Sequence, residues 1–257
     1  MEPLPEYVLV GDGPSSLVFL HGLGGDHTNW QPQLAEFSPE YRCLAWTLPG
    51  YGGSPAMASL TWPKLSDMLL RVLDHAGIAR ATVIGLSMGG YLAQQFAVDH
   101  KGRVDKLVLA ATSAQFGRGN ASFKKKYLAA RLTPLDDGTT PADLASDVVQ
   151  ALLSVDASPE AIANATASMS GISAAAYRQA IECLVTWDFD QHLDQIEAPT
   201  LCIAGEHDRT APVAALKALA SGIPNATVAV IPNCQHLMNL DRPAEFNALL
   251  GTFLTPH

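Results

Sequence analysis

The chain has 257 residues, of which 48% are hydrophobic and 16% are charged, and its formal net charge at pH 7 is −9. This length and composition predict one large α/β domain, or one domain that carries an insertion, and they exclude global disorder. The acidic balance argues against non-specific binding of nucleic acid or of an anionic membrane. No apolar stretch approaches the roughly 18 residues that a membrane span needs, and residues 1–5 show no signal-peptide pattern.

The cysteines indicate a reduced, cytoplasmic protein. Cys43 and Cys202 lie in strand-like runs and Cys183 lies in a helical pattern, so these three are typical of a core, whereas Cys234 lies in a loop. No pair has the spacing of a metal or redox motif. We therefore expect no disulfide framework, no metal and no organic cofactor.

Apolar runs alternate with helical patterns along most of the chain. Such alternation predicts a mostly parallel, doubly wound sheet that is covered by helices on both faces. The expected strands span residues 7–10, 16–20, 41–48, 81–86, 104–111, 199–204 and 226–231. The expected helices that accompany them span residues 29–37, 62–75, 88–100, 213–221 and 243–254.

The alternation stops between residues 115 and 187, where only helical patterns occur, with turn signals at Thr133-Pro134, 136–138 and Ser158-Pro159. Ligands of open α/β sheets bind at the carboxyl ends of the strands. We therefore predict that 115–187 is an inserted helical cap, or lid, over that end. The core would then comprise residues 1–114 and 188–257.

The sequence Gly-Leu-Ser-Met-Gly at 85–89 fits the nucleophile-elbow pattern G-x-S-x-G. An apolar β-branched run precedes it and a helical pattern follows it. This arrangement predicts a tight strand-to-helix turn that projects the hydroxyl of Ser87, with the glycines leaving room for close packing. An ordinary turn is the alternative, but the flanking strand and helix favour an elbow.

A serine nucleophile needs a base, and the base needs an acid that orients it. His236 follows the last expected strand and is the best candidate base, although His207 also follows a strand. Asp208 is the candidate acid and Glu206 is its rival. The resulting order Ser…Asp…His is the order expected of α/β-hydrolases.

An oxyanion needs two preorganised N–H donors. The Met88 amide, at the start of the helix after Ser87, is the first candidate, and the Leu23 amide in the glycine-rich loop at 21–25 is the second. We expect His21, within that loop, to shape it rather than to act as the base. The loop lacks the Gly-Lys-Ser/Thr ending of a phosphate-binding loop.

The chain resembles the α/β-hydrolase fold superfamily, serine hydrolases in particular, over nearly its whole length. The segments that carry the resemblance lie at 21–25, 49–54, 85–90, 205–208 and 235–236. Within the superfamily, the sequences at 85–90 and 236–243 are similar to 3-oxoadipate enol-lactonases and related small carboxylesterases. The chain departs from many relatives at Thr47, where they have Asp, and at Gln235, where they have Gly before the histidine.

The resemblance and the residues together predict a serine hydrolase that cleaves a carboxylic ester or lactone of a small molecule through an acyl-enzyme. C–C bond hydrolysis of a ring-cleavage product, or amide hydrolysis, is the alternative on the same triad, although Leu237 stands where C–C hydrolases usually have an aromatic residue. A non-catalytic ligand-binding protein is the second alternative, which an intact triad disfavours. The oligomeric state is expected to be a monomer or a small homo-oligomer.

The predicted cap carries the residues that would choose the substrate. Its aromatic and sulfur side chains either line an apolar pocket or pack the cap against itself; they are Phe116, Tyr127, Met169, Tyr177 and Trp187. A substrate carboxylate could be bound by Arg118 or by the lysines at 124–126, but a lysine run is more often a solvated helix face. The same two alternatives, a carboxylate-binding residue or a solvated one, apply to Arg131 and Arg178.

Overall fold

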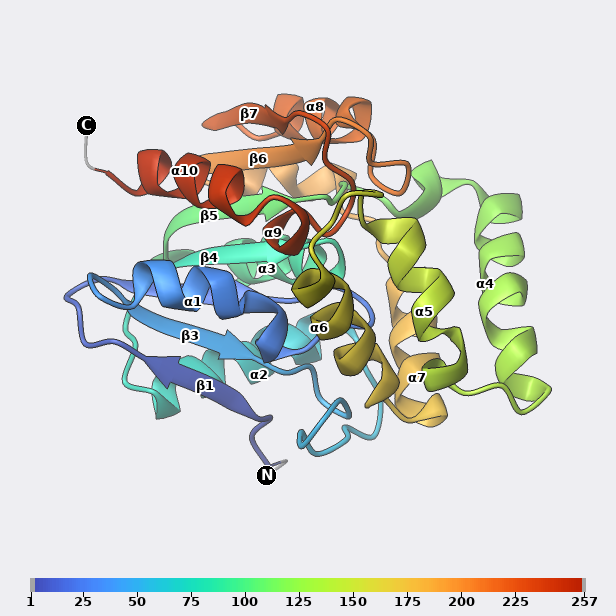
Figure 1. The fold of residues 1–257 in the computed structure, drawn as a ribbon. Helices are drawn as coiled ribbons and strands as arrows, with labels where there is room; N and C mark the ends of the chain where they lie inside the picture. The colour runs from blue at the N-terminus through green and yellow to red at the C-terminus, as the bar shows by residue number, and fades with distance from the viewer. Residues whose placement is uncertain (1–2, 256–257) are drawn as a thin grey trace.

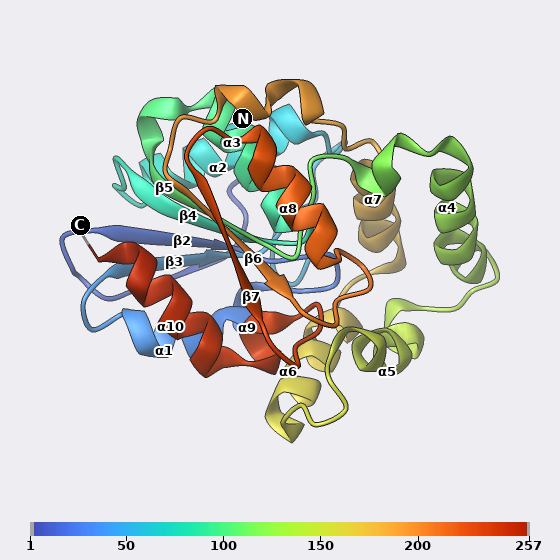
Figure 2. The same cartoon turned by 90° about the horizontal axis from the view of Figure 1, so that it is seen from above.

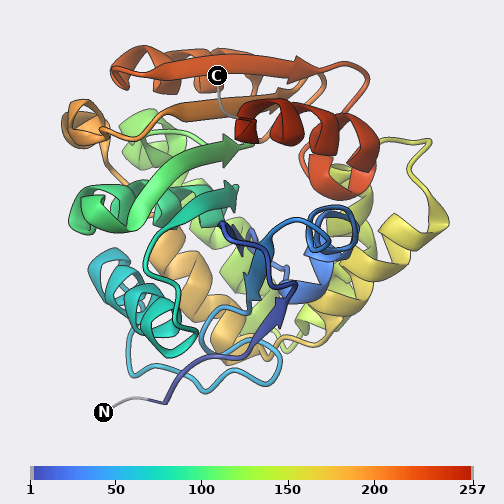
Figure 3. The ribbon, with the colours of Figure 1, turned by 90° about the vertical axis from the view of Figure 1, so that its left-hand side faces the viewer.

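The computed structural model describes residues 3–255, which contain one seven-stranded sheet of order β1-β3-β2-β4-β5-β6-β7. The strands are β1 (Tyr7–Val10), β2 (Ser16–Leu20), β3 (Arg42–Trp46), β4 (Ala81–Leu86), β5 (Val104–Ala110), β6 (Thr200–Gly205) and β7 (Ala226–Ile231). β1 pairs antiparallel with β3, and every other pairing is parallel. The predicted mostly parallel sheet is therefore confirmed, and Figure 3 shows its twist from β1 at the bottom to β7 at the top.

Helices cover both faces of the sheet, as Figures 1 and 2 show. α1 (Gln31–Phe37) and α10 (Pro243–Leu254) lie on one face, while α2 (Trp62–His75), α3 (Met88–Asp99) and α8 (Val213–Gly222) lie on the other. This double cover explains why every residue of the central strand β4 is buried. The amphipathic pattern of α2 directs its apolar residues to the core, and Gly77 ends the helix with a positive φ of 66°.

Four helices lie beyond the carboxyl ends of the parallel strands, on the right of Figure 1. They are α4 (Ala121–Asp136), α5 (Pro141–Leu152), α6 (Pro159–Ser170) and α7 (Ala174–Leu184). The chain leaves the sheet after β5 and returns to it at β6. An isolated antiparallel bridge between Gln115 and Asp188 joins the two ends of the excursion.

The structure corrects one turn prediction and adds short elements. α4 continues through Thr133 and Pro134, although Pro134 has no N–H to donate to the carbonyl four residues earlier. The helix ends two residues later, before Gly138, whose φ is 89°. A short helix that was not expected, α9 (Met238–Asp241), follows the loop that carries His236. The short 3-10 helices are η1 (His27–Trp30), η2 (Lys101–Arg103), η3 (Phe116–Gly119) and η4 (Asp190–Gln195).

All four cysteines are free and buried, including Cys234, which lies in a loop as expected. Burial raises the pKa of the Cys43, Cys183 and Cys202 thiols to about 12. These thiols therefore stay protonated at neutral pH. Within residues 3–255 no helix is both long enough and apolar enough to cross a membrane.

Candidate active site

Ser87 lies at the junction of β4 and α3, where the turn forces an unusual backbone. Its φ is 54° and its ψ is −116°, a region that L-residues rarely adopt and that costs of order 1–3 kcal/mol. The turn is fastened on both sides, since the Ser87 N–H donates to the Ala110 carbonyl at 2.8 Å and the Thr112 hydroxyl donates to the Ser87 carbonyl at 2.9 Å. The backbone strain therefore lies at Ser87, the residue whose hydroxyl the turn projects.

The glycines on either side of Ser87 are required by space. A Cβ on Gly85 would lie 2.3 Å from the Gly89 carbonyl oxygen, and a Cβ on Gly89 would lie 2.1 Å from the Leu20 carbonyl oxygen. Both neighbours are backbone atoms, so neither can move aside without shifting β2 or α3. The close helix–strand packing that the G-x-S-x-G pattern predicts is therefore present here.

Asp208 and His236 form a buried pair at the ends of β6 and β7. His236 Nδ1 lies 2.8 Å from Asp208 Oδ2, while Asp208 Oδ1 accepts hydrogen bonds from the backbone N–H groups of Thr210 (2.7 Å) and Ala211 (2.9 Å). Burial by itself raises the pKa of Asp208, but the bonds from His236 and from the two amides outweigh it, so the pKa falls below 3.8. The carboxylate is ionised at neutral pH.

An ionised carboxylate can only accept, so His236 Nδ1 carries the proton of this bond. The other ring nitrogen, Nε2, is then an unprotonated acceptor whenever the ring is neutral. His236 and Ser87 line the same cavity. In the part of the chain that the structure describes, the Ser87 hydroxyl makes no hydrogen bond, either with His236 or with another group.

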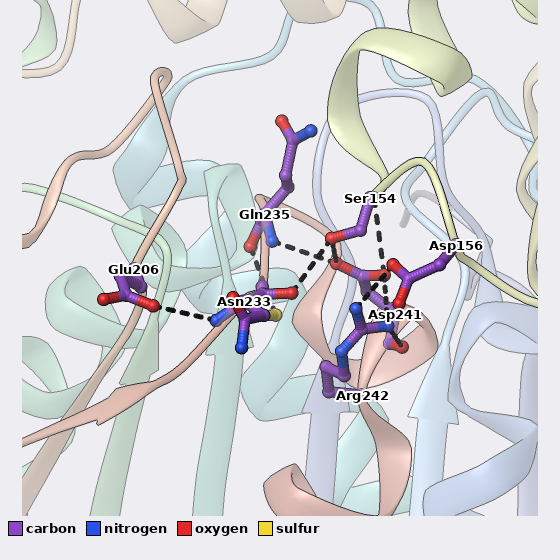
Figure 4. Close-up of polar contacts among 8 residues, drawn as sticks. Ser154, Asp156, Glu206, Asn233, Gln235, Asp241 and Arg242 are labelled. Atoms are coloured by element: carbon purple, nitrogen blue, oxygen red, sulfur yellow. Dashed lines mark hydrogen bonds and ion pairs between the residues drawn. The ribbon is translucent and has the colours of Figure 1, made fainter.

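The loop that carries His236 is fixed to the last residue of α5 and to the segment that follows it. The Leu152 carbonyl oxygen accepts from the N–H groups of both His236 and Leu237, each at 3.1 Å. Asp241, whose side chain is fully buried, accepts from the Gln235 N–H at 2.9 Å and from the Ser154 hydroxyl at 2.6 Å (Figure 4).

Arg242 extends this network across the two segments. Its guanidinium contacts Asp241 at 3.2 Å and Asp156 at 2.7 Å (Figure 4). Asp241 thus serves as a common acceptor for the histidine loop and for the segment between α5 and α6. A displacement of that segment would be transmitted to His236.

The two rival residues lie elsewhere. Glu206 is exposed, and its carboxylate accepts from the Asn233 N–H at 2.9 Å rather than from a histidine (Figure 4). His207 is exposed as well. Neither has the buried, hydrogen-bonded surroundings of the Asp208–His236 pair.

Leu23 and Met88 carry the two backbone N–H groups that the sequence suggests for binding an oxyanion. Leu23 lines the cavity that contains Ser87, and Met88 is the first residue of α3. Gly22 lies against the serine, because a Cβ there would be 3.1 Å from the Ser87 Cβ. Among the described residues neither the Leu23 nor the Met88 backbone N–H has a hydrogen-bond acceptor, so both donors are unoccupied.

His21 is buried and fixes the glycine-rich loop, as expected. Its Nδ1 lies 2.8 Å from the Gly22 carbonyl oxygen, and its Nε2 accepts from the Leu48 N–H at 2.9 Å. Burial lowers the pKa of His21 to about 4, against a smaller opposing effect of the Gly22 hydrogen bond. His21 is therefore neutral at pH 7.

A cavity of about 540 Å³ opens at Ser87 between the sheet and the helices α4, α5 and α7. Its size suits a small molecule. Three of the five cap residues singled out from the sequence line it, namely Phe116, Tyr127 and Tyr177. Met169 packs against Gly24 instead, and Trp187 is buried and stacks on Tyr91 with ring centroids 4.9 Å apart.

The basic residues of the cap also divide into those that line the cavity and those that do not. Arg118 and Arg131 line the cavity, whereas the lysines at 124–126 do not, and Arg178 is paired with Asp136. Arg209 also lines the cavity. Sequence reasoning missed Arg209, although its position directly after Asp208 was a usable signal. Nothing in residues 3–255 groups three or more metal-ligating side chains into a site.

Comparison with known proteins places this arrangement in a family. A family model described as the alpha/beta hydrolase fold matches residues 16–243. The chain belongs to the alpha/beta hydrolase family. The resemblance inferred from the sequence motifs is therefore confirmed.

The relatives are hydrolases of several kinds. The chain is 29% identical over 234 residues to 3-oxoadipate enol-lactonase 2 of Acinetobacter baylyi, a match that covers 90% of this chain and 85% of that protein. It is 31% identical over 242 residues to a poly(3-hydroxyalkanoate) depolymerase of Ectopseudomonas oleovorans, covering 93% and 83%. The solved structure of the enol-lactonase from Burkholderia xenovorans LB400 matches with a TM-score of 0.88 at 25% identity, covering 98% of this chain and 96% of that one. These findings identify the chain as a hydrolase.

Proposed function

We propose that this alpha/beta hydrolase cleaves a carboxylic ester or lactone of a small molecule, with Ser87 as nucleophile. One observation carries the proposal: His236 lines the cavity onto which the strained Ser87 opens, and the buried carboxylate of Asp208 holds its ring at 2.8 Å from behind the cavity wall. A hydroxyl and a base on one cavity, with a buried carboxylate that orients the base, form the arrangement that acyl transfer needs.

The reaction follows from these roles. When substrate fills the cavity, His236 Nε2 takes the proton of the Ser87 hydroxyl as its oxygen attacks the carbonyl carbon. The Leu23 and Met88 amides bind the oxyanion that develops. His236 then gives its proton to the leaving oxygen, and an ester of Ser87 remains. Water, deprotonated by His236, attacks this ester, releases the acid and restores the serine hydroxyl.

Asp208 stays ionised throughout. Its hydrogen bond holds the ring of His236 in the tautomer that accepts a proton at Nε2, and its charge stabilises the imidazolium that forms. The lowered pKa of Asp208 fits this role, because a carboxyl group that took up the proton would lose that stabilisation.

We further propose that residues 115–187 act as a cap and residues 1–114 and 188–257 as the hydrolase core. The support is that the cavity is lined jointly by the two parts, with Ser87 and His236 from the core and Tyr127 and Tyr177 from the cap. In this account the cap shapes the space for the substrate, while the core supplies the chemistry.

Covalent labelling tests the function with a built-in control. A fluorophosphonate should add one group to the protein, and peptide mass analysis should place it on Ser87. Ser113, a second serine on the same cavity whose hydroxyl donates to the Gln115 carbonyl at 3.1 Å, should stay unmodified. Labelling of neither serine would favour a ligand-binding protein, and labelling of both alike would refute selective activation of Ser87.

A further inference from the structure

Three arginines of this acidic protein line one cavity without a carboxylate partner among the described residues. Arg118, Arg131 and Arg209 have no carboxylate within ion-pair distance anywhere in residues 3–255, and all three line the cavity that contains Ser87. Four other arginines form ion pairs, namely Arg80 with Asp105, Arg103 with Asp74, Arg178 with Asp136, and Arg242 with Asp156 and Asp241, while Arg42 donates to the Ala76 and Gly77 carbonyl oxygens.

The cavity wall offers these arginines no counter-charge. Among the described residues that line it there is no Asp or Glu, although the whole chain has 25 acidic residues against 16 basic ones. Three like charges around one space repel one another, and the low dielectric of a partly enclosed cavity strengthens that repulsion. An anion in the cavity would relieve it.

The three arginines differ in burial and come from different segments of the chain. Arg131, on α4, is half-buried, and its guanidinium carbon lies 5.4 Å from the ring centroid of Tyr127. The same guanidinium also interacts with the Tyr127 hydroxyl, so the ring and the hydroxyl orient it together, and the planar group keeps further N–H donors for a ligand. Arg118 and Arg209 are exposed and approach from η3 and from the loop after β6. Arg131 is therefore the most buried of the three cations.

We propose that this cavity is a subsite for an anionic group, with Arg131 as its anchor, and that the preferred substrate is an ester or lactone that carries a carboxylate away from the scissile bond. The inference rests on the proposed function for its reaction, but not for its binding chemistry. A planar guanidinium meets a carboxylate through two parallel N–H···O bonds, which single out such substrates among esters of equal size.

The test compares two aryl esters of equal chain length. p-Nitrophenyl hexanoate is neutral, whereas the p-nitrophenyl monoester of adipic acid ends in a carboxylate. We expect kcat/KM to favour the adipate ester by tenfold or more at low salt, and Ser87→Ala gives the spontaneous rate to be subtracted. Monoesters of succinic, glutaric and pimelic acids then locate the chain length that best spans Ser87 and the anchor.

Variants assign the preference to the anchor. Arg131→Gln should lower the adipate-to-hexanoate ratio of kcat/KM at least tenfold. The matched control is Arg178→Gln, which removes a cap arginine that is paired with Asp136 outside the cavity and should leave the ratio at the wild-type value. A wild-type enzyme without preference for the acidic ester overturns the proposal. So does an Arg131→Gln variant that loses activity on both esters equally, because that outcome indicates a structural role.

Binding separates the subsite from the chemistry. Calorimetric titration of adipate into the Ser87→Ala variant measures the anion site without turnover, and the affinity should fall tenfold when Arg131→Gln is added. If adipate binds in this way but no ester is hydrolysed, the proposed function fails and the subsite stands. If esters are hydrolysed but Arg131→Gln leaves the affinity for adipate unchanged, the subsite fails and the proposed function stands.

Discussion

Replacing Gly89 by alanine should destabilise the protein strongly, because the elbow has no space for one more carbon. The new Cβ would lie 2.1 Å from the Leu20 carbonyl oxygen and 2.7 Å from the His21 carbonyl oxygen, both of which are backbone atoms. Either α3 or the end of β2 must then move. Overpacking of this kind costs typically 1–3 kcal/mol and occasionally more, and we expect about 3 kcal/mol here.

A loss of about 3 kcal/mol should lower Tm by roughly 6–12 °C in a domain of this size. Two control glycines separate the effect of space from that of backbone conformation. No atom lies within 4 Å of a Cβ on Gly102 or Gly138, but Gly138 has a φ of 89°. Gly102→Ala should therefore leave the free energy of unfolding unchanged or raise it by about 0.4–1 kcal/mol. Gly138→Ala should lower the free energy of unfolding, because its positive φ disfavours a side chain.

Thermal unfolding followed by circular dichroism, in parallel with kcat/KM on a short-chain aryl ester, measures both consequences. Gly89→Ala should lose turnover as well as stability, since the shift of α3 carries the Met88 amide away from the oxyanion. A Gly89→Ala variant with the Tm and turnover of Gly102→Ala would refute the reasoning. It would mean that the elbow is looser than its contacts indicate.

Three further predictions test the surroundings of Ser87. Asp208→Asn should lower kcat by about three to four orders of magnitude, because an amide does not hold the required tautomer of His236, whereas Glu206→Gln should change kcat less than threefold; steady-state kinetics on both variants decides between the two acids. Asp241→Asn should lower Tm, because hydrogen bonds to a buried charge are worth about 1.5–3 kcal/mol each. It should also reduce kcat by a larger factor than it changes KM, because the loop of His236 depends on this acceptor. An unchanged kcat would show that the loop is held without Asp241. The free energy of unfolding should fall by about 3 kcal/mol between pH 6.5 and pH 4 through His21 alone, because its folded pKa of about 4 lies below the unfolded value of 6.5, so the unfolded chain binds the proton more readily as the pH falls. His21→Asn should remove this part of the pH dependence in urea titrations, and an identical slope in both proteins would contradict the assignment.

Local chemistry explains which parts of the molecule could be predicted from the sequence. The strand at 81–86, the glycines around Ser87 and the helix at 62–75 each carry a strong local signal, and the structure places β4 and α2 at those residues. The turn expected at Thr133-Pro134 was wrong, because α4 accommodates Pro134 near its C-terminal end, where only two helical residues follow the proline.

The lining of the cavity depends on contacts between distant segments, which the sequence pattern does not contain. Tyr127 and Trp187 have the same apolar character in the sequence, yet Tyr127 lines the cavity and Trp187 stacks on Tyr91 in the core. That Arg131 and Arg209 have no carboxylate partner within residues 3–255 also depends on how distant segments fold together. It becomes visible only when the positions of all carboxylates around them are known.

The most direct test of the account is the turnover of Ser87→Ala beside that of Ser113→Ala. Both substitutions remove one hydroxyl from the same cavity, and both variants should fold, which their circular dichroism spectra would check. The value of kcat/KM on an aryl ester should fall at least a thousandfold for Ser87→Ala and stay within about threefold of the wild type for Ser113→Ala. Near-normal turnover of Ser87→Ala would contradict the assignment of the nucleophile and, with it, the proposed mechanism.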